Sequence, residues 1–405
     1  MTAVVDANPQ DRAGDPDHTR VHDLVEQLLA GHPPAGTAPA EFLGAQFDAG
    51  LAWVHFAEGS GGLGLRPELQ RTVQERLALA RAPHPYGRNP IGYGMGAPTV
   101  AMHGSESQLH RYLRPLFTGE EVWCQLFSEP GAGSDVASLS CRAVRDGDEW
   151  VVNGQKVWTT LAHVSKFGML VARTDPNQPK HKGLTYFVVD MEAPGVEVRP
   201  LRQITGEAEF NEVYFTDVRI PDSERLGDVG EGWRVSLTTL MNERVSIGGN
   251  VPPKGSGPIA EAVKIWRDKG YTDPAVKDQL MCLWTRAEVL RLTNWRASQN
   301  RKVGTPGPEG SIGKVAFAEL NKDVTAFTLG LLGADGMLYG SYAMRRPVTA
   351  MSFDNPHQAF LRCRANSIEG GTTEVMKNIL GERVLGLPGD IRTDKDRPWI
   401  EVPRS

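Results

Sequence analysis

The sequence predicts an α+β protein in which an N-terminal helical domain is followed by a middle antiparallel β domain and a C-terminal four-helix bundle. Two observations support this prediction. Apolar residues recur every three or four positions at both ends of the chain, and short segments rich in β-branched and aromatic residues fill the middle. The predicted parts are a disordered tail, the helical domain, the β domain, the bundle and a second tail, at residues 1–20, 21–119, 120–230, 231–388 and 389–405.

Helical periodicity marks the two ends of the chain. Near the N-terminus, Val21, Leu24 and Leu28 fall on one side of a helix. Clusters of proline and glycine, such as HPPAG and APHPYGRNP, divide this part into short helices. Beyond residue 231 the same period returns in longer segments, and one helix face of the predicted bundle collects Leu280, Leu283, Trp284, Ala287 and Leu290.

The middle of the chain has the pattern of an antiparallel sheet. The tripeptide Asp146-Gly147-Asp148 separates two apolar segments and predicts a hairpin turn. Polar or Gly/Pro-bearing links separate the further strands, which are predicted at residues 168–173, 184–190, 196–200 and 213–220. This spacing favours a barrel or a sandwich over a βαβ sheet.

Composition excludes several classes of function. The 405 residues carry a net charge of -5 and no basic run, so neither nucleic acid nor a membrane is expected as a partner. No stretch approaches the roughly eighteen apolar residues of a membrane-spanning helix, and residues 1–20 lack the apolar core of a signal peptide. The four cysteines form neither a CxxC pair nor a zinc spacing with histidine. They predict free thiols, no metal site and a cytoplasmic location.

The densest motif is FSEPGAGSD at residues 127–135, where a helical segment gives way to strands. Gly131 and Gly133 are expected to adopt positive φ and to leave peptide N–H groups free for a ligand. Ser128 and Ser134 add hydroxyl groups. The spacing differs from GxGxxG, so a dinucleotide-binding strand–turn–helix unit is not predicted. A plain tight turn between two elements is the competing interpretation.

Two further clusters resemble ligand-binding elements. The segment NGQKVWTT, residues 153–160, places Trp158 before two threonines, so the indole either lies against a planar ring or fills the core. The segment EGGTTE, residues 369–374, predicts a helix start with Thr372 or Thr373 as the cap. Such a helix start also suits an anion or a polar ligand.

A fourth cluster, LMNERV at residues 240–245, lies on a predicted amphipathic helix. Leu237, Leu240 and Met241 are expected to share one face with Val245, and a Glu-Arg pair interrupts the apolar run. Taken alone, such a pair is usually a solvated charge pair.

Taken in order, the four clusters resemble the acyl-CoA dehydrogenase family over roughly residues 21–388. The pair SEPGAGSD and NGQKVWTT carries most of the resemblance. The resemblance implies a soluble FAD-dependent enzyme that removes a proton and a hydride from adjacent carbons of an acyl-CoA thioester and yields the trans-2-enoyl-CoA. It also implies that FAD lies between the β domain and the bundle.

The resemblance also assigns roles to single residues. The expected flavin contacts are Phe127, Ser128, Gly133, Ser134, Trp158, Thr159, Thr160, Gly333, Thr372 and Glu374. The expected thioester contacts are Ser134 at the pantetheine, Arg244 at the CoA end and Gly370 at the family's usual base position.

One position decides which carboxylate is the base. The α-proton of a thioester is weakly acidic, so a carboxylate with a raised pKa has to accept it. In the commonest members of the family a glutamate directly precedes Gly-Thr, but here Gly370 occupies that position and Glu369 falls one residue early. Isovaleryl-CoA dehydrogenase and the long-chain enzymes carry a Glu-Arg pair on the first helix after the β domain, which Glu243-Arg244 resembles. Glu243 is therefore the expected base, ahead of Glu369.

Two departures from the family pattern narrow the expectation. The usual Arg-x-x-Phe-Gly run is not evident around residues 266–271, and the glutamine expected at the glycine-rich residues 330–336 is absent. These features resemble bacterial dehydrogenases that act on bulky thioesters, including those of steroid side chains. The expected partners are an acyl-CoA, an electron-transferring flavoprotein and further copies in a dimer or homotetramer, with a heteromer as the alternative. A flavin monooxygenase or oxidase of the same fold and a non-catalytic subunit are the competing functions.

Overall fold

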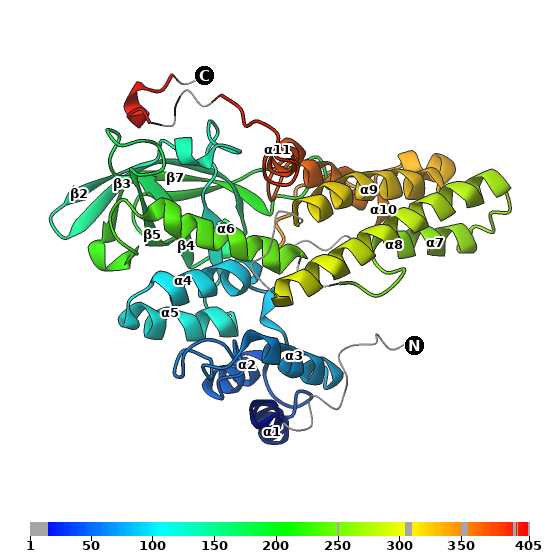
Figure 1. The fold of residues 1–405 in the computed structure, drawn as a ribbon, viewed down its shortest axis with the longest axis horizontal. Coiled ribbons are helices and arrows are strands. Elements are labelled where there is room, and N and C mark those ends of the chain that lie inside the picture. Colours follow the sequence, from blue (N-terminus) through cyan, green and yellow to red (C-terminus); the bar gives the residue numbers. More distant parts are fainter. Residues whose placement is uncertain are drawn as a thin grey trace.

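The structure, a computed structural model, shows a helical N-terminal domain, a β domain and an elongated C-terminal bundle (Figure 1). It describes residues 15–248, 251–303, 310–349, 355–391, 394 and 396–403, without the side chains of residues 243–248 and 300–303. The predicted order of a helical, a β and a second helical part is confirmed.

Five helices build the N-terminal domain: α1 (Pro16–Gly31), α2 (Pro39–Asp48), α3 (Gln70–Leu79), α4 (Ala97–His103) and α5 (Glu106–Thr118). Helix α1 begins inside the segment expected to be a disordered tail, because Asp15 caps it by accepting the Asp17 N–H at 3.1 Å and Pro16 fits its first turn. Of that expected tail, residues 1–14 lie outside the described residues. Val21 and Val25 then bury one face of α1.

The β domain is one eight-stranded sheet in which neighbouring strands follow the order β6-β7-β3-β2-β4-β5-β8, with β1 beside β4. Its strands are β1 (Trp123–Leu126), β2 (Arg142–Asp146), β3 (Glu149–Thr160), β4 (Phe167–Arg173), β5 (Leu184–Asp190), β6 (Val196–Pro200), β7 (Phe210–Pro221) and β8 (Arg225–Leu226). The predicted hairpin is confirmed, with Gly147 at φ 64° between β2 and β3. The sheet is not wholly antiparallel, because β1 and the first residue of β2, Arg142, pair parallel to β4.

Alternation along the central strands separates two cores. On β4, Phe167 and Met169 face a core shared with the N-terminal helices, and Leu170 and Ala172 face a second core that the curled sheet encloses. Both faces of β4 are therefore buried, which is the environment that an uninterrupted apolar strand requires.

The C-terminal part contains α6 (Gly232–Gly248), α7 (Pro258–Asp268), α8 (Pro274–Val303), α9 (Gly310–Gly330), α10 (Pro356–Arg362) and α11 (Thr373–Arg383). Helix α9 lies in the middle of the bundle, against α7, α8, α10 and α11. The predicted apolar face of α8 is confirmed, since Leu280 and Leu283 are buried against α7 and α9. Helix α6 instead lies across the β domain, between β5 and α4 (Figure 1).

Candidate active site

The motif at residues 127–135 leaves the end of β1 and runs to the short turn η5 (Val136–Ser138). Phe127 is buried and packs edge-on against Tyr186, with ring centroids 5.9 Å apart. Ser128 is half-buried and its carbonyl accepts the Val157 N–H at 2.9 Å, which joins this motif to the end of β3. Ser134 is exposed.

The two glycines of the motif differ from the expectation of positive φ. Neither Gly131 nor Gly133 has a positive φ, so local backbone strain does not explain them. Both are exposed, and a Cβ built on either would meet no atom within 4 Å. Open space therefore borders the backbone here, as a motif that approaches a ligand requires.

A buried ion pair that the sequence analysis did not single out joins the first two motifs. Lys156 is fully buried on β3, and its Nζ donates to the Phe127 carbonyl at 3.0 Å and to Glu129 Oε1 at 2.9 Å. Glu129 also accepts the N–H groups of Ser140 and Cys141, at 2.6 and 2.9 Å. The sequence signal for this pair is a lysine at an inward position of an alternating β-strand, because a buried charge needs a partner of opposite charge.

The three predicted flavin contacts at the end of β3, Trp158, Thr159 and Thr160, differ in how far they are exposed. A register shift separates Lys156 from Thr159, and within it Trp158 adopts φ 60°. The indole is 57% exposed and stands edge-on to Phe210 at 5.8 Å, so the interpretation of Trp158 as a core aromatic is wrong. Thr159 is fully buried and its Oγ1 has no hydrogen-bond partner among the described residues, whereas Thr160 is half-buried.

The third motif forms the loop before α11. Gly370 and Gly371 have φ of 61° and 92°, and a Cβ on Gly371 would lie 2.5 Å from Met376 Cε, so both positions favour glycine. Thr372 is the cap of α11, since its side chain accepts the Val375 N–H at 3.1 Å. The hydroxyl of the next residue, Thr373, is buried without a partner in the described part of the chain. Glu374 is exposed on the first turn.

Glu369 is held by the buried side chain of Arg362. The guanidinium donates to both carboxylate oxygens, at 3.0 and 2.7 Å, and Asn366 donates to one of them at 2.9 Å. The same guanidinium lies 5.6 Å from the Phe210 ring and 3.9 Å from Glu209, whose pKa is raised by burial. The loop that carries Glu369 is therefore docked on the start of β7, beside the strand end that carries Trp158.

Helix α6 is fixed to the β domain by a chain of buried hydroxyl groups. Thr239 Oγ1 lies 3.0 Å from Tyr186 Oη on β5 and 3.0 Å from Thr99 Oγ1 on α4. The sequence analysis expected an apolar face through Leu237 and Met241, but both are exposed, since α6 turns its Val235, Ser236 and Thr239 side inward. Residue 243 follows Thr239 by one helical turn. The side chains of Glu243, Arg244 and Val245 lie outside the described residues.

The structure joins most of the expected site, but not all of it. Phe127, Ser128, Trp158, Thr159 and Thr160 are linked directly through β3, and Phe210 with Arg362 connects them to the loop at residues 369–374. Gly333 starts the turn η8 (Gly333–Met337) after α9. Among the described residues, no hydrogen bond or ion pair joins Gly333 to the β domain.

The seam between β3 and the start of α11 suits an extended aromatic cofactor. It offers an exposed indole, two buried hydroxyls, at Thr159 and Thr373, that have no hydrogen-bond partner among the described residues, and open space beside Gly131 and Gly133. Buried polar groups normally have partners, so the two free hydroxyls indicate a polar ligand at this seam. A helical domain, a β sheet and a helical bundle around such a seam form the arrangement of the flavoprotein class that the sequence resembles.

Within that class the chain belongs to the acyl-CoA dehydrogenase family. Models of the N-terminal, middle and C-terminal domains of acyl-CoA dehydrogenases match residues 20–120, 124–218 and 230–385. The chain is 37% identical to acyl-CoA dehydrogenase FadE34 of Mycobacterium tuberculosis (strain ATCC 25618 / H37Rv) over 390 residues, 96% of this chain. It spans 52% of FadE34, about half of that relative's length.

Solved structures give the same family. The Tcur3481-Tcur3483 steroid ACAD superposes with a TM-score of 0.70 at 26% identity, covering 94% of this chain and 100% of that chain. The ChsE4-ChsE5 complex from Mycobacterium tuberculosis superposes with a TM-score of 0.68 at 26% identity, covering 96% of this chain and 100% of that chain. Among the residues that the structure describes, no helix is long and apolar enough to cross a membrane.

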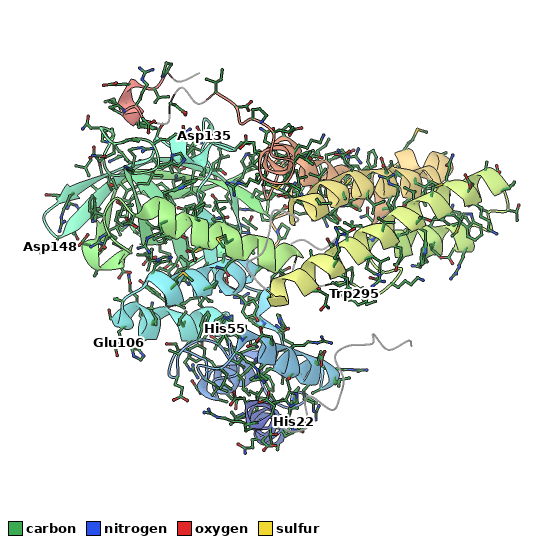
Figure 2. All side chains as sticks on the ribbon, viewed as in Figure 1. His22, His55, Glu106, Asp135, Asp148 and Trp295 are labelled. Atoms are coloured by element: carbon green, nitrogen blue, oxygen red, sulfur yellow. The ribbon has the colours of Figure 1, made fainter. Side chains whose placement is uncertain are left out.

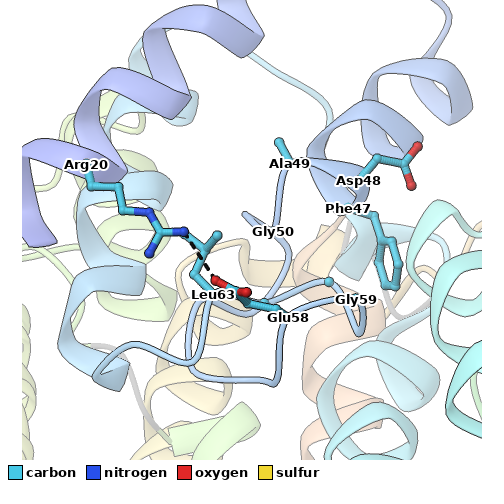
Figure 3. A pocket seen from close by; sticks show the side chains of 10 residues that line it. Arg20, Phe47, Asp48, Ala49, Gly50, Glu58, Gly59 and Leu63 are labelled. Carbon is cyan, nitrogen blue, oxygen red and sulfur yellow. Dashed lines mark hydrogen bonds and ion pairs between the residues drawn. The ribbon is translucent and has the colours of Figure 1, made fainter. Parts of the chain in front are cut away.

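A separate hollow of about 380 Å³ lies in the N-terminal domain (Figure 3). Arg20 of α1 reaches across it to Glu58, with Nη2 and Oε1 3.3 Å apart. Its other lining is largely loop backbone at residues 59–63 and the end of α2. None of the residues expected to contact flavin or thioester lines this hollow.

Proposed function

We propose that this chain is an FAD-dependent acyl-CoA dehydrogenase that converts an acyl-CoA thioester to its trans-2-enoyl-CoA. The observation that carries the proposal is the seam, where an exposed Trp158 and the buried, unpartnered hydroxyl of Thr159 adjoin the FSEPGAGSD motif. FAD bound here supplies a two-electron acceptor for the β-hydride. The chain itself has to hold the flavin, orient the thioester and accept the α-proton.

The Trp158 face and the Thr159 and Thr160 hydroxyls are proposed to hold the flavin ring, with Phe127 and Ser128 beside it. Thr372, Glu374, Gly133 and Ser134 are proposed to complete the site. The indole projects from a bulge and is not packed into the core, which leaves its face available for a planar partner. Gly333 remains a proposed flavin contact, in the assembled protein.

Glu243 is the proposed base, and two observations support this choice over Glu369. Both oxygens of Glu369 already accept hydrogen bonds from the buried Arg362, so taking up a proton would break a charge-assisted pair. Residue 243 stands one turn after Thr239, on the side of α6 that packs on β5 and α4. A base for a weak carbon acid needs the raised pKa that desolvation gives, and the side of α6 that carries Thr239 is buried.

The remaining substrate contacts are also proposals. Arg244 suits the phosphate-bearing end of CoA, Ser134 the pantetheine, and the Gly370 backbone the thioester carbonyl. A bulky or branched acyl chain, including a steroid side chain, is the proposed substrate, and similarity to a solved steroid ACAD supports it. An electron-transferring flavoprotein is the proposed acceptor.

A second apolar face of α8, which is exposed, supports the proposal that the protein assembles with another chain. Met281, Val289, Leu292 and Trp295 on α8 are 41% to 57% exposed. Such a face indicates contact with another chain. A homo-oligomer, dimer or tetramer, is proposed, with a heteromer as the alternative because the similar ChsE4-ChsE5 structure is a complex. A cytoplasmic location agrees with the four free thiols.

The test compares Glu243→Gln with Glu369→Gln in the FAD-loaded protein. Glu243→Gln keeps the side-chain shape and removes the proton acceptor, so bleaching of flavin absorbance by acyl-CoA should slow by about 10²–10⁴-fold. Glu369→Gln should keep most of this rate, because its partners Arg362 and Asn366 are structural. If Glu369→Gln abolishes bleaching and Glu243→Gln does not, Glu369 is the base.

The same assay separates the competing functions. Slow reoxidation of the reduced flavin by oxygen, with fast reoxidation by an electron-transferring flavoprotein, supports a dehydrogenase. Rapid oxygen consumption would indicate a monooxygenase or an oxidase. A purified protein that takes up no FAD on reconstitution would indicate a non-catalytic subunit.

A further inference from the structure

The C-terminal strap, defined as residues 394 and 396–402, returns to the β domain instead of hanging free. It lies beyond residue 385, where the match to the family's C-terminal domain ends. The Trp399 N–H donates to Gln178 O at 2.9 Å, and the Ile400 N–H donates to Pro176 O at 3.0 Å. Figure 1 shows this segment crossing the β domain away from the bundle. The strap therefore lies outside the part of the chain that the model of the family's C-terminal domain matches.

Trp399 covers the turn that follows the FSEPGAGSD motif. Its side chain is buried, and its Nε1 donates to Ser138 O at 3.1 Å. Beneath the indole, at 4.5 Å, lies the guanidinium of Arg173, which donates to Ala137 O at 2.6 Å and to Leu139 O at 3.2 Å. Three successive carbonyls are thus fixed by one arginine and one tryptophan that contact each other.

A lysine joins the strap to the motif itself. Lys180 Nζ donates to Asp135, the last residue of the motif, at 2.8 Å and to Asp394 of the strap at 2.5 Å. Burial opposes the charge on Lys180, but its hydrogen bonds to the two carboxylates hold its pKa above the ordinary value. Figure 2 shows Asp135 on the side of the β domain that the C-terminal segment crosses. The loop is therefore tied at its far end by a shared ammonium group.

Between these ties, the loop is held by the paired backbone of Glu129 and Ala132 at its start and by the Ser138 N–H to Asp135 O bond at its end. Residues 133–135 are exposed, and the space beside Gly131 and Gly133 is open. Glu129 anchors its start through Lys156, and the strap secures its end. An exposed, glycine-bearing loop is costly to order on binding unless the fold orders it first.

We infer that Trp399 and Asp394 are positioning residues that order residues 131–138 for the acyl-CoA thioester. The inference rests on the proposed function, in which Ser134 of this loop contacts the pantetheine. The strap sets affinity for the thioester and takes no part in proton or hydride transfer. Its loss should raise KM and leave kcat nearly unchanged, because a disordered loop has to be ordered by the substrate.

The experiment uses the full-length, FAD-loaded protein and two variants. Trp399→Ala removes the ring over Arg173 and the N–H to Ser138, and Asp394→Asn removes one carboxylate from Lys180. Hydrogen exchange of residues 131–138 in the substrate-free protein should speed up in both. KM for an accepted acyl-CoA should rise about tenfold in Trp399→Ala, with kcat within about twofold when both proteins are saturated with FAD.

Matched controls remove similar groups elsewhere. Glu192→Gln breaks a lysine–carboxylate pair of similar length, 2.7 Å to Lys166, whose other carboxylate partner is Asp190. Ile400→Ala shortens an exposed strap side chain that does not reach the turn. Both should match the wild type in exchange and KM. If Trp399→Ala does not fold, Trp399→Phe keeps a ring over Arg173 and loses the N–H, and should show a smaller rise in KM.

The outcomes separate the two proposals. If hydrogen exchange of residues 131–138 and KM are both unchanged in Trp399→Ala while the wild type is active, the proposed role of the strap is wrong. Faster exchange with unchanged KM also overturns it, since the loop would then not serve the thioester. A wild type that dehydrogenates no acyl-CoA overturns the proposed function instead.

Discussion

Replacing Lys156 by methionine should destabilise the β domain strongly. The ammonium group is fully buried between Phe127 O and Glu129, and Glu129 is only 8% exposed. Without the lysine, a buried carboxylate keeps two backbone N–H donors but loses its counter-charge. Breaking a buried pair from one side costs about 3–5 kcal/mol, a large share of the roughly 5–15 kcal/mol that stabilises a typical protein.

The assay is thermal unfolding of the FAD-free protein, followed by circular dichroism. Lys156→Met should lower the unfolding midpoint by roughly 5 °C. The double variant Lys156→Met/Glu129→Gln should recover part of the loss, because no charge is stranded, although the single glutamine oxygen can replace only one of the two carboxylate oxygens that accept from Ser140 and Cys141. Lys166→Met is the control, since Lys166 pairs with Asp190 and Glu192 at the surface, where such pairs contribute about 0–1 kcal/mol.

Equal losses from Lys156→Met and Lys166→Met would refute the buried-pair reasoning. A double variant no more stable than the single variant would refute the account of a stranded carboxylate. Lys156→Met should also retain FAD less well than the double variant retains it. Lys156 donates to the Phe127 carbonyl and lies two residues before Trp158, and Phe127 and Trp158 are both proposed flavin contacts.

Two further predictions concern contacts at the edge of the seam. The pKa of His163 is lowered by burial and then by Arg346, so the unfolded chain protonates first as pH falls below about 6.5. The contribution of His163 to stability is then complete above that pH and is lost as the pH falls. His163→Gln can still donate to Pro347 O but does not titrate. Its thermal unfolding midpoint should therefore fall less than that of the wild type between pH 7.5 and 5.5. Thr372→Ala should lower stability by about 1 kcal/mol in urea unfolding, because α11 loses its cap, while Thr372→Ser should not. An equal pH dependence in His163→Gln, or an equal loss in Thr372→Ser, would contradict these assignments.

Local patterns in the sequence determined most elements of the β domain. The predicted strands 184–190 and 196–200 match β5 and β6. The Asp-Gly-Asp turn was predicted from the same kind of signal, because turn residues and side-chain alternation act over a few neighbouring positions. A cap at Thr372 or Thr373 was predicted from the start of a helical pattern, and the structure has the cap at Thr372. The order of the two motifs was also sufficient to indicate the family.

Contacts between distant residues decided what the patterns left open or misplaced. Whether Trp158 fills the core or projects outward depended on a bulge opposite β7, which composition does not encode. The inward side of α6 was chosen by hydrogen bonds from Thr239 to Tyr186 and Thr99, so its polar residues are buried and Leu237 is exposed.

The same holds for the C-terminal strap, whose Trp399 lies 261 positions along the chain from the carbonyl that it contacts. A pattern of neighbouring residues reports which local conformations are favourable. It does not report which of several distant surfaces an element will bury. That choice is made by the packing of the whole fold, because only there do groups such as Glu129 and Lys156 find partners that offset their desolvation.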